Sequence, residues 1–230
     1  MTKRIGLALL AAALLAGAFA LGRYAAPCRP ATPAPAPAPE VPLDARDVRP
    51  LLPGARVGEM TLRTHEGQPF DLARALDDKT TVLVFYRGGW GHVCNTQLAQ
   101  LKGLWPRLTE LGCQLIVVSP DSPPHAAETV RRHGLEFPVL SDQDVVAAKA
   151  FGVAFRLDEK ALREYEADFG VDIEAASGRT HHVLPVPSVF VIDRDRRVRY
   201  QHANPAFRDR IDPEVLLAEA EAVAQPRGRE

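Results

Sequence analysis

The sequence predicts an α/β domain in which a central mixed β-sheet is flanked by helices. Two apolar runs without polar alternation, residues 79–86 and 114–119, are typical of strands that are buried on both faces. Between them, leucines recur at spacings of three and four, which predicts a helix that packs one face on the sheet. A strand, a helix and a second strand in this order favour parallel pairing with a right-handed crossover.

Composition limits what this domain can do. The chain has 230 residues, of which 46% are hydrophobic and 25% charged, and this is enough for one compact domain with short extensions. A formal net charge of −1 offers no excess positive charge for a nucleic-acid backbone, so we expect no nucleic-acid partner. Three cysteines exclude a disulfide-rich scaffold and a zinc site of four thiolates, which leaves sulfur chemistry with one or two thiols.

Two segments precede the domain. Residues 1–26 are predicted to be a signal peptide or a signal anchor, because Lys3 and Arg4 precede an uncharged apolar run. As a helix this run spans roughly 26 Å, short of the ~30 Å hydrocarbon core, so its length does not decide between cleavage and anchoring. Residues 27–43 form a Pro/Ala-rich linker of the extended polyproline II type. We therefore expect an exported or membrane-anchored protein whose domain, residues 48–224, works in the cell envelope on the extracytoplasmic (periplasmic) side.

The remaining segments alternate helices and short strands. Helices are predicted over residues 123–133 and 142–151, with an extended segment at 137–140 between them. An amphipathic helix over residues 157–169, followed by a polar loop, is interpreted as an insertion. The last predicted elements are a β-hairpin of residues 188–193 and 197–201, and a helix over 214–224 with Asp212 as N-cap and Pro213 in its first position.

The most informative stretch is the glycine-rich turn after the first buried strand, FYRGGWGHVCNTQLAQL at residues 85–101. It places Cys94 in the first turn of a helix, where free backbone N–H groups and the positive end of the helix dipole favour a thiolate. Cys94 is therefore the candidate catalytic nucleophile. The alternative is a buried cysteine that only fills the core, as many free cysteines do.

Several segments of the domain carry a family resemblance. They are the turn YRGGW, the residues Cys94-Asn95 with Gln97-Leu98, and the runs VVSPDSP, HGLEFPVLSD, FGVAFRL, LPVPSVFVIDRD and DPEVLLA. Together they resemble the peroxiredoxin-like branch of the AhpC/TSA family, within the thioredoxin superfamily. The resemblance covers about residues 48–224 and implies a thioredoxin-like fold. It also implies an antioxidant thiol oxidoreductase in which Cys94 reduces a hydroperoxide without a cofactor.

The chain departs from this family around the cysteine. Gly91 replaces the first cysteine of the family's W-C-P-Y-C-N turn, and His92 stands where proline follows, so a CxxC dithiol cannot form. The proline, threonine and arginine that surround a peroxiredoxin thiol are absent, because their places hold Arg87, Gly91 and Pro187. Arg87 and a protonated His92 are the candidate sources of positive charge beside the thiolate, and Trp90 belongs to the same turn.

The resemblance to the thioredoxin superfamily further implies a cis peptide bond between Val186 and Pro187, with Pro185 as the competing candidate. Such a proline shapes a groove beside the cysteine turn. The groove supports an alternative function, a redox-inactive binding module that holds a peptide or a partner. A less favoured alternative is a carrier of copper or zinc, which would combine Cys94, His92, His181 and His182.

An oxidised Cys94 must be returned to the thiol by a second sulfur. Cys113 is a poor partner, because a helix separates it from Cys94 by about 25 Å, and we expect it to be buried and inert. Cys28, on the linker, is the candidate resolving cysteine. An external thiol, such as glutathione or a thioredoxin-like protein, is the simpler reductant, and the sequence leaves the oligomeric state open.

Overall fold

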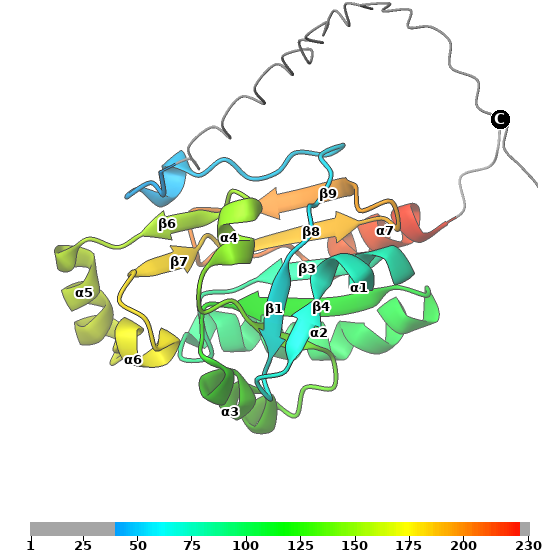
Figure 1. The fold of residues 1–230 in the computed structure, drawn as a ribbon. Coiled ribbons are helices and arrows are strands. Elements are labelled where there is room, and N and C mark those ends of the chain that lie inside the picture. Colours follow the sequence, from blue (N-terminus) through cyan, green and yellow to red (C-terminus); the bar gives the residue numbers. More distant parts are fainter. Residues whose placement is uncertain (1–39, 226–230) are drawn as a thin grey trace, which may run out of the picture. The chain divides into compact units, whose positions relative to one another are not determined.

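The computed structural model describes residues 40–225, which form one mixed sheet of seven strands with helices on both faces (Figure 1). The main sheet has the order β2-β1-β5-β4-β3-β8-β9, built from β1 (Thr61–Thr64), β2 (Pro69–Asp71), β3 (Thr81–Phe85), β4 (Gln114–Ser119), β5 (Val139–Ser141), β8 (Ser188–Ile192) and β9 (Val198–Ala203). The helices around it are α1 (Leu72–Asp78), α2 (His92–Glu110), α3 (Pro123–His133), α4 (Val146–Ala150), α7 (Pro213–Ala224) and the short 3-10 helix η1 (Ala45–Asp47). This confirms the predicted α/β class with a mixed central sheet.

The predictions for residues 1–39 lie outside the described residues. They concern the signal peptide or anchor, most of the linker, and Cys28. Within residues 40–225, no helix is both long enough and apolar enough to cross a membrane.

The two predicted apolar strands form the centre of the sheet. β3 and β4 pair in parallel, in register from Thr81 opposite Gln114 to Phe85 opposite Val118. β8 joins the other side of β3 in antiparallel orientation and continues through a hairpin into β9. The parallel pair, the helix that connects its strands and the hairpin are therefore as the sequence predicted.

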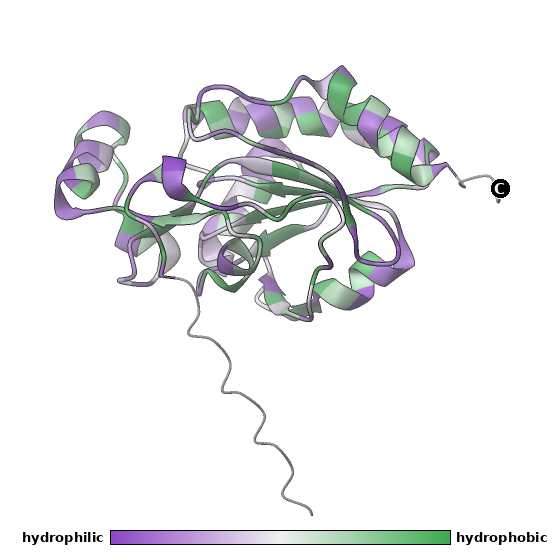
Figure 2. Ribbon diagram, turned by 90° about the horizontal axis from the view of Figure 1, so that it is seen from above, coloured by the Kyte–Doolittle hydropathy of each residue, from purple (hydrophilic) through white to green (hydrophobic). Residues whose placement is uncertain are grey.

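Alternate side chains of β3 separate two hydrophobic layers. Val82 and Val84 face the layer that α2, α3 and α7 cover. Leu83 and Phe85 face the opposite layer, which α1 and α4 cover. In Figure 2 the strands are mostly green, whereas the helices around them carry both green and purple segments, as expected for helices that bury one face.

Local capping decides where two of the helices begin. Asp212 caps α7 as predicted, because its carboxylate accepts two backbone N–H groups of the first turn. α4 begins four residues later than the predicted start at Asp142. The Asp142 carboxylate instead accepts the N–H groups of Ala147 and Ala148, while Val145 takes a φ of +50° that interrupts the helix.

The insertion contains more structure than the sequence predicted. The predicted amphipathic helix is α5 (Glu159–Phe169), but the expected polar loop after it contains α6 (Ile173–Ser177) and β7 (Val183–Pro185). β7 pairs with β6 (Ala154–Arg156) in a separate two-stranded sheet. Phe155 and Leu184 of this pair belong to a third hydrophobic cluster, whereas Ala154 and Val183 pack in the layer that α1 and α4 cover. Figure 1 shows α5 and α6 together at one end of the main sheet.

The expected cis peptide bond between Val186 and Pro187 is wrong, since residues 40–225 contain no cis peptide bond. Backbone hydrogen bonds hold the residues on both sides of this trans bond. The N–H group of Val186 donates to the carbonyl of Val153, which extends the pairing of β6 with β7 by one residue. The Pro187 carbonyl accepts the N–H group of Asn204, and β8 begins at the next residue, Ser188.

We expect Phe190→Ala to lower the free energy of unfolding by about 3–5 kcal/mol, because the truncation leaves a cavity in a packed core. Phe190 is fully buried, and its ring centroid lies 4.9 Å from that of Phe151 and 6.0 Å from that of Phe85. Val215→Ala, at an exposed position on α7, is the control, with an expected change of about 0.5 kcal/mol or less. Chemical denaturation measures both; similar losses in the two variants would contradict the prediction.

Candidate active site

The glycine-rich turn between β3 and α2 has little room for side chains. Gly88 has a φ of +154°, which L side chains rarely adopt, and a Cβ there would clash with Trp90 Nε1. A Cβ on Gly89 would clash with Thr129 Oγ1. The Gly89 N–H group donates to the carboxylate of Asp121, 2.8 Å away. The two glycines therefore let the turn fold tightly enough to place the start of α2 at the end of β3.

Cys94 lies in the first turn of α2, which begins at His92. It is only 3% exposed, yet it lies on the wall of a cavity of about 140 Å³. Aromatic and basic residues make up most of the cavity wall. The lining residues are Arg87, Trp90, Gly91, His92, Val93, Cys94, Tyr165, Phe169, Phe207 and Arg208. The thiol thus combines a helix N-terminus with access for a small molecule.

Aromatic rings form much of this cavity. The Trp90 centroid lies 5.7 Å from Tyr165 and 6.0 Å from Phe169, and Phe169 in turn lies 6.3 Å from Phe207. Tyr165 and Phe169 come from α5, so the insertion helps to enclose the thiol. The sequence predicted α5 as an amphipathic helix, but no pattern in it indicated which part of the domain its aromatic residues contact.

Arg87, a candidate from the sequence, is 5% exposed and lines the same cavity. Its guanidinium carbon lies 4.5 Å from the Phe207 ring centroid and 5.3 Å from that of Phe155, and its Nη1 donates to the Tyr165 hydroxyl. Burial lowers the pKa of Arg87, while the neighbouring Tyr165 and Cys94 act in the opposite direction. The structure therefore places a buried positive charge close to the thiol.

A second guanidinium approaches the thiol, and the sequence analysis missed it. Arg210 Nη2 donates to Cys94 Sγ at 3.6 Å. Burial lowers the pKa of Arg210, and the charge of Cys94 opposes that shift. Arg210 lies in the loop between β9 and α7, 116 positions from Cys94 in the chain. Arg210 lies in a loop, where the sequence has no helical or strand periodicity. The sequence therefore could not show that Arg210 contacts Cys94.

Gly91 and His92 flank the thiol on its own helix. Gly91 is the N-cap of α2, and a Cβ there would lie 3.2 Å from Cys94 Sγ. The missing side chain therefore leaves space beside the sulfur. His92 is exposed at the start of α2 and lines the cavity.

Val186 and Pro187 do not line this cavity. Both are buried, and the Pro187 carbonyl accepts the N–H group of Asn204 at 3.4 Å. That contact joins the start of β8 to the loop that carries Arg210. Pro187 thus supports the site through its backbone. The binding-module hypothesis expected a groove beside Pro187, but the cavity next to Cys94 is lined by other residues.

Cys113 is buried at the far end of α2, as expected. Its sulfur lies 3.9 Å from the carbonyl oxygen of Ala220, and burial raises its pKa to about 11. A thiol with such a pKa is almost entirely protonated near neutral pH, and protonated thiols are poor nucleophiles.

The two histidines of the metal-carrier hypothesis are engaged elsewhere. Val183 N–H donates to His181 Nδ1, so His181 Nε2 donates to the carbonyl oxygen of Gln143, and burial lowers the pKa of His181. His182 contacts Glu174. In residues 40–225 there is no group of three or more His, Cys, Asp or Glu side chains that could hold a metal ion.

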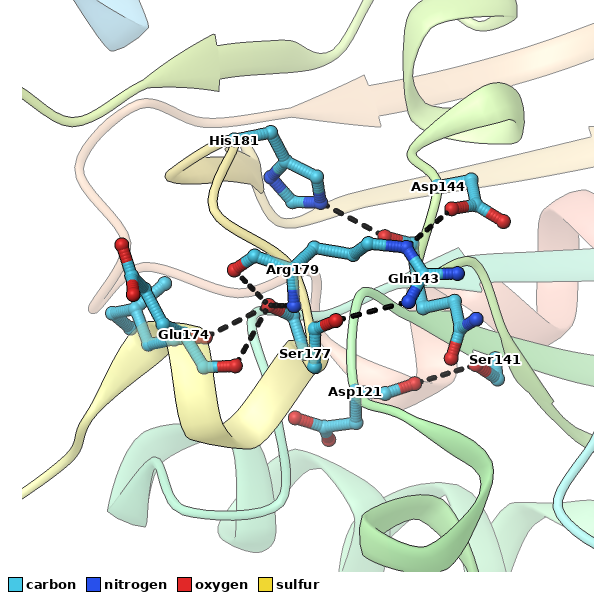
Figure 3. A network of polar contacts seen from close by, with 10 residues as sticks. Asp121, Ser141, Gln143, Asp144, Glu174, Ser177, Arg179 and His181 are labelled. Atoms are coloured by element: carbon cyan, nitrogen blue, oxygen red, sulfur yellow. Dashed lines mark hydrogen bonds and ion pairs between the residues drawn. The ribbon is translucent and has the colours of Figure 1, made fainter.

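Figure 3 shows that His181 belongs to a polar network between the insertion and the main sheet. Arg179 Nε donates to Asp144 at 2.7 Å, and the Ser177 hydroxyl donates to the backbone of α6. Nearby, the Ser141 hydroxyl donates to the carbonyl of Asp121 at 2.6 Å. This network fastens the segment after α6, and with it the insertion that bears the aromatic residues.

The mixed sheet with helices on both faces and the cysteine at the start of α2 are those of a thioredoxin-like protein, and comparison with known proteins assigns its family. The model of the AhpC/TSA family matches residues 53–201, and the chain belongs to this family. A protein described as "Putative peroxiredoxin bcp" from Haemophilus influenzae is 33% identical over 75 residues, which is 33% of this chain and 48% of that protein. The chain thus matches about half the length of this curated relative.

Solved structures share the fold at low sequence identity. Peroxidoxin BcpB from Mycobacterium tuberculosis has a TM-score of 0.57 and 22% identity, over 74% of this chain and 97% of that chain. Peroxiredoxin Q from Xanthomonas campestris has a TM-score of 0.56 and 22% identity, over 78% and 99% of the two chains. A cysteine-to-serine mutant of PrxQ from Xylella fastidiosa has a TM-score of 0.60 and 18% identity, over 76% and 98%. These likenesses confirm the predicted thioredoxin-like fold.

We expect Asp121→Asn to change how stability depends on pH. Burial raises the pKa of Asp121 to about 6 from 3.8, against hydrogen bonds from Gly89 and Ser119. A folded-state pKa above the unfolded value means that the stability which Asp121 contributes is present below pH ~4 and is lost as pH rises through ~6.

The free energy of unfolding of the unsubstituted protein, minus that of Asp121→Asn, should therefore fall by about 2 kcal/mol between pH 4 and pH 7. Urea denaturation at a series of pH values measures this difference. Asp142, whose pKa burial also raises to about 6, is present in both proteins and cancels. A difference that is constant or that grows with pH would show that Asp121 does not titrate in this way.

Proposed function

We propose that the protein is a thiol peroxidase that uses Cys94 as its single reacting cysteine. The Cys94 thiolate attacks the distal oxygen of a hydroperoxide and the O–O bond breaks. The sulfur becomes a sulfenic acid, and the alkoxide or hydroxide that leaves takes up a proton as an alcohol or water. The observation that carries this proposal is the contact of Arg210 Nη2 with Cys94 Sγ at 3.6 Å, at the first turn of α2.

The residues around Cys94 fit the charge that this reaction develops. A guanidinium next to a thiol favours the thiolate, and its other N–H groups can hold the oxygen that leaves. Arg210 contacts the sulfur, while Arg87 brings a second guanidinium into the same cavity. The aromatic rings from α5 limit the entry of water and admit the organic part of a hydroperoxide.

An external thiol is the proposed reductant, either glutathione or a thioredoxin-like protein. Cys113 is buried at the other end of α2, so it cannot form a disulfide with Cys94. The hypothesis that Cys28 resolves the sulfenic acid concerns residues outside those described and stays a prediction.

We further propose that the domain works in the cell envelope, on the extracytoplasmic side. This proposal is supported by the sequence of residues 1–26, in which Lys3 and Arg4 precede an uncharged apolar run, and by the Pro/Ala-rich linker that follows. An uncleaved run would attach the protein to the membrane, whereas cleavage would release it.

Cys94→Ser is expected to abolish turnover of hydrogen peroxide and of cumene hydroperoxide, because the variant has no nucleophilic sulfur in the cavity. Cys113→Ser is the matched control and should retain at least half of the activity, since its sulfur is buried 3.9 Å from a backbone carbonyl. Intact mass spectrometry after one equivalent of peroxide should show a gain of one oxygen on Cys94. Turnover that survives Cys94→Ser would overturn the proposed function.

Arg210→Gln is expected to slow both peroxide reduction and alkylation of Cys94 by iodoacetamide at pH 7 by about tenfold or more, as the positive charge beside the thiolate is lost. Arg210→Lys keeps the charge and should recover part of the alkylation rate. Arg107→Gln is the control, because Arg107 is exposed and ion-paired with Glu214. Equal alkylation rates in the Arg210 and Arg107 variants would show that Arg210 has no such role.

A further inference from the structure

The cavity next to Cys94 carries more positive charge than one sulfur can balance. Arg87 is buried there, Arg210 is half-buried against the sulfur, and the exposed Arg208 also lines the cavity. None of the residues that line it is Asp or Glu. Within residues 40–225, Arg87 Nε, Arg210 Nε and Arg210 Nη1 are buried without a hydrogen-bond partner. Buried donors without a partner are costly, so this arrangement points to an anionic ligand that completes the site.

Oxidation of the sulfur strengthens the attraction for an anion. In the thiolate form that the proposed reaction uses, Cys94 supplies one negative charge beside Arg210, whose Nη2 lies 3.6 Å from the sulfur. The protonated sulfenic acid that the proposed reaction leaves is neutral, so the guanidinium groups then have no counter-charge on the protein side of the cavity. The site therefore attracts an anion most strongly at the step at which a reductant must enter.

The geometry beside the sulfur favours a small reductant. A Cβ on Gly91 would lie 3.2 Å from Cys94 Sγ, and the missing side chain leaves room for an incoming sulfur atom. Cys94 itself is 3% exposed beside a cavity of about 140 Å³ with aromatic walls. A thiol on a short flexible chain fits this approach better than a cysteine held on the surface of a folded protein.

We infer that the reductant of oxidised Cys94 is a small thiol that carries a carboxylate, the chemical class to which glutathione belongs. This inference rests on the proposed peroxidase function. The thiolate of the reductant attacks the sulfur of the sulfenic acid, an S–S bond forms, and the S–O bond breaks to release hydroxide, which takes up a proton as water. A second molecule of the thiol then attacks the mixed disulfide, which restores Cys94 and releases the disulfide of the reductant.

Three thiols of equal chain length test the inference: 3-mercaptopropionate, 2-mercaptoethanol and cysteamine, which end in a carboxylate, a hydroxyl and an ammonium group. The full chain with Cys28→Ser and Cys113→Ser is treated with one equivalent of hydrogen peroxide, and each thiol is added. Intact mass spectrometry gives the rate at which the mixed disulfide on Cys94 forms. The rates are measured again after adding Arg208→Ser or Arg208→Lys, substitutions at an exposed position.

The ratio of the mercaptopropionate rate to the cysteamine rate should fall about three- to tenfold with Arg208→Ser and stay nearly unchanged with Arg208→Lys. The intrinsic reactivity of each thiol cancels in this comparison. Salt at 0.5 M should also lower the ratio, because it screens exposed charges. A ratio that neither Arg208→Ser nor salt changes would overturn the inference, as would a disulfide with Cys28 that forms in the unsubstituted chain before any added thiol reacts. If peroxide adds no oxygen to Cys94 at all, it is the proposed function that fails.

Discussion

The contact between the Arg210 guanidinium and the Cys94 sulfur is the interaction on which the site depends. A thiol that is 3% exposed among aromatic rings has little water to stabilise a negative charge, so the protein must supply the balancing charge itself. Arg210 Nη2 lies 3.6 Å from the sulfur, and the first turn of α2 adds backbone N–H groups. The loop of Arg210 is held between β9 and α7, and the Pro187 carbonyl accepts the N–H group of Asn204 at its start.

The rest of the domain holds these two groups together. β3 and β4 lie in the centre of the sheet, so the turn after β3 starts from a rigid strand. Gly88 and Gly89 have no side chains that would clash with Trp90 and Thr129. The N–H group of Gly89 donates to the carboxylate of Asp121, which fixes the turn. The insertion then adds Tyr165 and Phe169 from α5 (Figure 1), and the network around Arg179 and His181 fastens it to the start of α4 (Figure 3). The turn after β3 and the insertion thus both contribute residues that surround the thiol.

Sequence reasoning worked where a local pattern carries the information. Unbroken apolar runs identified β3 and β4, leucine spacing identified α2, and the turn composition placed Cys94 at its start. It failed where the structure depends on distant contacts. The three-residue strands β6 and β7 and the five-residue α6 are too short for a period to appear. Arg210 lies in a loop, and only the packing of α7 against the sheet and α2 brings it to a cysteine 116 positions earlier.

The chain lacks the family residues that surround the thiol, but residues from other positions in the sequence bring positive charge to the same place in the structure. An electrostatic interaction depends on the distance between charges and on their burial, and the place of the residue in the chain does not enter. The family resemblance places Pro187 where a peroxiredoxin carries its arginine. Arg210, from the loop after β9, nevertheless contacts the sulfur, and Arg87, after the end of β3, lines the same cavity. With Gly91 in the place of the first cysteine, the site has one sulfur fewer. The missing side chain also leaves space on the side of Cys94 that a side chain at position 91 would cover. Within residues 40–225, the space beside Gly91 and the arginines around Cys94 therefore leave an open, positively charged approach to the sulfur, along which a thiol from outside this region can reach it.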